Sequence, residues 1–80
     1  MTRLSQAQAV EFIERFNTAP DFIAVTHVEA FLAEDVQDVL AELSQFAADI
    51  DPDSFEVTPD AIEDMGIFGA KIIIRTEDAV

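Results

Sequence analysis

Apolar residues near the start of the chain recur at helical spacing. The stripe follows i, i+3, i+4 and i+7 positions and consists of Ala9, Phe12, Ile13 and Phe16. Ser5 is a suitable N-cap, and Gln8 three residues later completes a capping box. Asn17 and Pro20 are typical of a helix end. This pattern predicts a helix over residues 5–17.

Residues 22–31 are rich in β-branched and aromatic side chains, which favours a strand. A capping-box spacing inside the segment would favour a helix there instead. Apolar residues farther along the chain recur at helical spacing. If that helix continued backwards through this segment, Glu29 would lie on its apolar face and Phe31 on its polar face, which argues against a helix here. We therefore predict a strand over 22–28, a transition, and a helix over 33–48.

The second half of the chain contains clear turn signals. Asp-Pro-Asp at 51–53 indicates a turn, and 54–57 alternates as a short strand. A proline at a first helical position and Gly66 at the end predict a short helix or helical turn over 59–65. Residues 69–76 form the clearest strand.

These elements predict an α+β fold within a single compact domain spanning residues 1–80. Two main helices and a short third helical turn would pack on a small antiparallel sheet of about three strands. Pairing of 54–57 with 69–76 would bring Lys71 or Arg75 toward Glu56.

Charge changes the picture more than composition does. The chain has 17 Asp and Glu but 4 Lys and Arg, for a net charge of −13. With 50% hydrophobic residues it is too apolar for a disordered acidic tail. The lack of a basic footprint argues against direct nucleic-acid binding. The 55 residues between Arg15 and Lys71 contain 13 acidic residues and no Lys or Arg, although solubility needs a net charge of only about 2–8.

The expected location is the cytoplasm, which would be a bacterial host's cytoplasm for a phage-encoded protein. The chain has no cysteine, its first residues lack the apolar run of a signal peptide, and no apolar run is long enough for a membrane. An anionic membrane surface would repel it.

No catalytic constellation stands out, and we expect neither enzymatic activity nor a cofactor. His27 is the single histidine and lies among apolar residues, where a structural or half-exposed role is expected. Gly66 and Gly69 do not make a phosphate-binding loop. Glu11 and Arg15 have the spacing of an i,i+4 ion pair.

A calcium site is one alternative reading. Asp49, Asp51 and Asp53 have the spacing that opens an EF-hand loop, and Asp60 falls at the twelfth position. Ser54 stands where that loop needs glycine, and two prolines stiffen it. These departures favour a capped, solvated turn without a metal.

A second alternative comes from Asp53-Ser54-Phe55, which resembles the Asp-Ser-Leu motif of acyl carrier proteins. The resemblance implies phosphopantetheine attachment at Ser54. In that family the serine opens a long helix, whereas an extended segment is expected here.

The acidic residues of the second helix favour a different function. Glu34, Asp38 and Glu42 would place carboxylates about 6 Å apart along one line, and duplex DNA carries about one charge per 1.7 Å. A protein that binds DNA would meet a comparable anionic surface. The candidate partner-binding residues are Glu34, Asp35, Asp38, Glu42, Asp49, Asp51, Asp53, Asp60, Glu63 and Asp64.

In length, cysteine-free α+β make-up and its acidic block, the chain resembles small acidic phage and mobile-element proteins that mimic DNA, including several anti-CRISPR proteins. The resemblance implies an inhibitor that occupies the DNA-binding groove of a CRISPR surveillance complex. The class also includes inhibitors of restriction enzymes, repair glycosylases and nucleoid proteins. The alternative is an interaction module or homodimer that associates through Phe31, Ile67 and Phe68; the protein itself is expected to be a monomer or homodimer.

Overall fold

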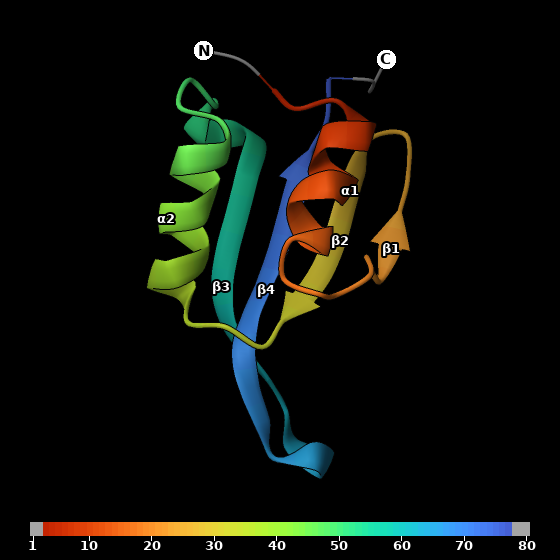
Figure 1. The fold of residues 1–80 in the computed structure, drawn as a ribbon. Helices are drawn as coiled ribbons and strands as arrows, with labels where there is room; N and C mark the ends of the chain where they lie inside the picture. The colour runs from red at the N-terminus through yellow and green to blue at the C-terminus, as the bar shows by residue number, and fades with distance from the viewer. Residues whose placement is uncertain (1–2, 78–80) are drawn as a thin grey trace.

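The computed structural model describes residues 3–77, which form a four-stranded antiparallel sheet with both helices on one face (Figure 1). The sheet order is β1-β2-β4-β3. The elements in chain order are α1 (Gln6–Glu14), β1 (Phe22–Ile23), β2 (His27–Leu32), α2 (Val36–Phe46), the 3-10 helix η1 (Pro52–Ser54), β3 (Phe55–Ile62), the 3-10 helix η2 (Glu63–Met65) and β4 (Ile67–Arg75). The α+β class is confirmed, with four strands in place of about three.

Helix α1 begins as its sequence predicts. The Ser5 hydroxyl accepts a hydrogen bond from the Gln8 backbone N–H at 3.1 Å, and the Gln8 side chain accepts one from the Ser5 N–H at 3.0 Å. Two otherwise unsatisfied donors of the first turn are therefore paired. The helix ends at Glu14, and Asn17 adopts a positive φ of 58° in the turn that follows.

The prediction of one strand over 22–28 was wrong, because the chain reverses direction inside that segment. Phe22 and Ile23 pair antiparallel with Glu29 and Val28. The reversal lies between them, where the Ala24 N–H donates to the His27 carbonyl at 2.9 Å. The second strand, β2, then runs to residue 32 with alternating burial. The high β propensity of the whole segment hid the turn, which contains neither glycine nor proline.

Helix α2 is shorter than the predicted 33–48. Asp35 is its N-cap, and the Asp35 Oδ1 accepts a hydrogen bond from the Gln37 N–H at 2.8 Å. Glu34 therefore precedes the helix instead of lying on it. Val39 and Leu43 are buried against the sheet.

The predicted helical turn over 59–65 is confirmed only over its last three residues. Strand β3 continues through Pro59 to Ile62, and only residues 63–65 form a 3-10 turn. Pro59 is tolerated because β3 is an edge strand, and pairing with β4 outweighs the local preference for a helix start. Gly66 ends the turn in the left-handed conformation, with φ of 65°, as its position predicts.

The hydrophobic core lies between the helices and the sheet. Its fully buried large residues are Phe12, Ile13, Val28, Leu32, Val39, Leu43, Ile72 and Ile74. The Phe12 ring contacts Phe16 edge-on at a centroid distance of 5.3 Å and Phe46 at 5.4 Å. Aromatic contacts of this kind connect α1 to the end of α2.

Beyond the core, strands β3 and β4 project as a two-stranded hairpin (Figure 1). Strand β2 pairs with β4 only as far as Leu32 opposite Ala70, which also pairs with Pro59, so residues 60–69 pair only with each other. We call residues 60–69 the hairpin arm. It contributes to an elongated shape with extents of 37 × 23 × 20 Å.

Candidate partner-binding surface

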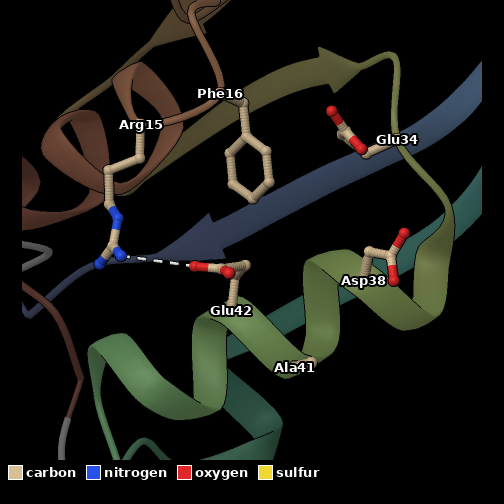
Figure 2. Close-up of a pocket in the computed structure, with 6 residues that line it drawn as sticks. All are labelled: Arg15, Phe16, Glu34, Asp38, Ala41 and Glu42. Atoms are coloured by element: carbon tan, nitrogen blue, oxygen red, sulfur yellow. Dashed lines mark hydrogen bonds and ion pairs between the residues drawn. The ribbon is translucent and has the colours of Figure 1, made fainter.

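An acidic hollow lies between the end of α1 and the side of α2 that faces it (Figure 2). Its lining consists of Arg15, Phe16, Glu34, Asp38, Ala41 and Glu42. The Phe16 ring points into the hollow between Arg15 on one side and Glu34 on the other. The three carboxylates of the predicted line thus share one concave surface, although Glu34 comes from the loop before α2.

One basic residue reaches this hollow. The Arg15 Nη2 lies 3.4 Å from the Glu42 Oε2, and its guanidinium lies over the Phe46 ring at 5.4 Å from the centroid. Arg15 therefore pairs with a residue of the other helix. The ion pair with Glu11 that the i,i+4 spacing predicted is not formed. Neither Glu34 nor Asp38 forms an ion pair with another residue of the described range 3–77.

Three of the candidate residues also have local structural roles. Asp35 caps α2, and Asp51 caps η1 by accepting a hydrogen bond from the Asp53 N–H at 3.0 Å. The Asp60 side chain accepts one from the Ala61 N–H at 2.8 Å. Short polar side chains commonly bond to nearby backbone in this way, so part of the acidic content is used for caps and turns.

The candidate residues lie in three groups along the length of the molecule and do not form one patch. Glu34, Asp35, Asp38 and Glu42 belong to the hollow and the adjoining start of α2. Asp49, Asp51 and Asp53 follow the other end of α2, while Asp60, Glu63 and Asp64 lie on the hairpin arm (Figure 1).

The face of the sheet that the helices leave uncovered carries basic residues. Val28, Ala30 and Leu32 point to the helices, so the intervening residues of β2 point to the other face. Register then places Lys71 and Arg75 of β4 on that face, and Arg75 pairs there with Glu56 at 2.8 Å, as predicted. Lys71 and Arg75 are thus on the open face, whereas Arg3 lines one hollow with Arg75 and another with Asp49 beyond the end of α2.

Counting charged residues along the sequence did not reveal that Lys71 and Arg75 lie on a different face from the acidic hollow. The sequence signal was present, because Lys71 and Arg75 alternate with the buried Ile72 and Ile74. As a result, Arg15 is the basic residue that lies near the acidic hollow in the described part of the chain.

The predicted apolar patch is divided between two faces. Ile67 and Phe68 are successive residues of β4 and point to opposite sides of the strand. Phe31 pairs with Lys71 on the open face and is half-buried, whereas Phe68 is 79% exposed. The three residues therefore do not form a single surface.

The EF-hand reading fails on geometry. Residues 55–60 are extended in β3, so Asp60 lies about 17 Å along the strand from Phe55, the residue that follows the acidic turn. Within residues 3–77, no group of three or more His, Cys, Asp or Glu side chains is close enough together to hold a metal ion.

Ser54 is not accessible for attachment of a group, and His27 contacts two neighbouring side chains. Ser54 is fully buried, and its hydroxyl donates to the Asp51 carbonyl at 2.6 Å. His27 is half-buried, with Nδ1 2.9 Å from the Thr26 hydroxyl and Nε2 3.7 Å from Glu29. The acyl-carrier resemblance therefore does not extend to an accessible attachment site.

Compared with protein-family models, curated protein sequences and solved structures, the chain matches none of them significantly. Among the helices formed by residues 3–77, none has the length and apolar character needed to cross a membrane.

Proposed function

We propose that this protein is a non-catalytic inhibitor that binds a basic DNA-binding protein through its acidic helix side and competes with DNA. The hollow of Glu34, Asp38 and Glu42 is the centre of the binding surface. The acidic groups at the end of α2 and on the hairpin arm extend it. The partner that we propose is a CRISPR surveillance complex, whose target-binding groove must attract a DNA duplex.

Charge density is the observation that supports this proposal. Residues 3–77 include 16 of the 17 acidic and all four basic residues, for a net charge of −12. Divided along the 37 Å axis, this is about one net charge per 3 Å, more than half the density of duplex DNA at about one per 1.7 Å. The axis also approximates one turn of B-DNA, about 34–36 Å.

Separation of charge adds to this argument. Lys71 and Arg75 lie on the open sheet face. They therefore do not neutralise the carboxylates of the helix side, which is strongly negative. Opposite fields accelerate the encounter of two proteins and weaken as salt is added. Repulsion among the unpaired carboxylates of the free protein is then relieved when a basic partner binds.

The test is a competition assay with a purified CRISPR surveillance complex and labelled target duplex. The wild-type protein should displace the duplex at low salt and lose this ability by a few hundred millimolar salt. The E34K/D38K/E42K variant should not displace it. A matched control, E11K/E14K/E77K, changes the same number of charges at exposed positions outside the hollow and should still compete.

Full competition by E34K/D38K/E42K would rule out the α2 surface. Equal failure of the control would mean that net charge, not position, carries the binding. If the surveillance complex is unaffected by the wild type, the same assay with a restriction endonuclease, a repair glycosylase and a nucleoid protein tests the wider class of partner.

The exposed apolar residues of the arm favour a second candidate function, an interaction module or homodimer without DNA mimicry. Met65 is 69% exposed and Phe68 is 79% exposed. Association through these residues would persist at high salt, which electrostatic capture would not.

A further inference from the structure

A second hollow adjoins the acidic one and shares Glu34 with it. Its polar side consists of Glu34 and Asp35 at the start of α2, and its apolar side includes Val36, Pro59 and Phe68. The two hollows therefore form a continuous surface on which carboxylates lie next to apolar groups.

Phe68 is the most exposed large apolar residue of the described chain, at 79%. It belongs to the hairpin arm, beyond the last pairing of β4 with β2, so no third strand or helix covers it. Exposed apolar surface bordered by polar groups commonly marks an interaction site. Aromatic side chains also act as anchors in protein interfaces.

The lack of a side chain at Gly69 explains why Glu34 and Asp35 lie beside the Phe68 ring. A Cβ at Gly69 would collide with the Leu32 carbonyl oxygen and would lie 3.0 Å from the Ala33 Cα. The absence of that atom lets the connection from β2 to α2 cross closely over β4. The crossing delivers Glu34 and Asp35 to the base of the arm.

We propose that Phe68 is a second anchor of the partner-binding surface, where it receives an apolar side chain adjacent to a basic side chain on the partner. The inference rests on the proposed function and makes it more specific. The basic side chain pairs with Glu34 and Asp38, while its apolar neighbour packs on Phe68 and Pro59. A purely cationic surface, such as a polylysine segment, would satisfy only half of this site.

Charge complementarity identifies a basic partner and not a second copy of this chain. Residues 16–70 contain no Lys or Arg, so two arms or two helix sides would bring like charges together. Of the basic residues of a second copy, Arg15 is already paired with Glu42, Arg75 is already paired with Glu56, and Lys71 lies on the open sheet face.

The test uses two synthetic peptides of equal length and positive charge. Arg alternates with Leu in one and with Gly in the other. The wild-type protein should bind the Arg-Leu peptide roughly tenfold more tightly than the Arg-Gly peptide, since burial of an apolar side chain contributes at least that factor. The F68A variant should lose this preference. The matched control F22A removes a 49% exposed phenylalanine at the other edge of the sheet and should keep it.

A preference that survives F68A, or no preference in the wild type, would overturn the inference while leaving the acidic surface in place. Unchanged affinity of E34K/D38K/E42K for both peptides would instead contradict the proposed function. Concentration-dependent dimerisation that F68A abolishes would identify a second copy as the occupant and would also overturn the inference.

Discussion

Arg15 of α1 and Glu42 of α2 form an ion pair across the acidic hollow, with 3.4 Å between Nη2 and Oε2. The two residues are separated by 27 positions in the sequence. The pair neutralises one end of the hollow and leaves Glu34 and Asp38 at the other end. Arg15 is thus an internal cation at a surface that we propose receives the cations of a partner.

Removal of that cation should therefore strengthen binding. In the variant Arg15→Gln, Glu42 loses its partner and becomes available to a basic ligand. We expect the affinity for the Arg-Gly peptide to rise several-fold. The free energy of unfolding should change by less than about 1 kcal/mol, because exposed ion pairs contribute little. Fluorescence titration and urea unfolding measure the two effects, and a weaker complex would contradict the role of Glu42.

Adjacent acidic residues at the start of α2 should behave differently when removed. Asp35→Ala removes the N-cap hydrogen bond to Gln37 and should lower the free energy of unfolding by about 1 kcal/mol. Glu34→Ala removes no cap and should leave it nearly unchanged, while weakening peptide binding. Denaturant unfolding of both variants separates the structural carboxylate from the binding one. Equal destabilisation would show that Asp35 does not act as a cap.

The two glycines should differ in their tolerance of a methyl group. Gly69→Ala should destabilise the fold by about 2 kcal/mol or more, because its Cβ collides with the Leu32 backbone and lies 2.9 Å from the Phe31 ring. Gly66→Ala has open space around it and should cost only about 1 kcal/mol, from its φ of 65°. Thermal unfolding checks the order, and a stable Gly69→Ala protein would mean that the crossing can move away.

Ser54 should remain unmodified by a phosphopantetheinyl transferase. Its hydroxyl is buried and donates to the Asp51 carbonyl, so the enzyme cannot reach the oxygen in the folded protein. Intact mass after incubation with coenzyme A should not change, whereas an acyl carrier protein in a parallel reaction should gain the prosthetic group. A mass increase that is lost in Ser54→Ala would restore the acyl-carrier reading.

Local signals predicted some elements well. The capping box of Ser5 and Gln8 specifies where α1 begins, because both partners lie within one turn of each other. The placement of Ile72 and Ile74 on one face and of Lys71 and Arg75 on the other identifies β4. The Arg75–Glu56 pair also followed from a correct guess of strand pairing.

Other elements depended on distant neighbours. Pro59 and Gly66 indicated a helical turn, but β4 pairs with residues 55–62 and keeps them extended. The turn near residue 25 had no glycine or proline to reveal it. The pairing of β1 with β2 decides the position of this turn. The same pairing brings Asp21 close to β2, where its carboxylate accepts a hydrogen bond from the Phe31 N–H at 2.9 Å.

The sequence by itself determined the excess of carboxylates, the cation-free stretch and the amphipathic faces of both helices, since each is a property of composition or of short-range spacing. The tertiary structure decided how the charges are distributed in space. It brought Arg15 to Glu42, kept Lys71 on the open sheet face and placed Phe68 beside Glu34. These relationships require strand register and a close crossing at Gly69, which arise only when distant segments pack together.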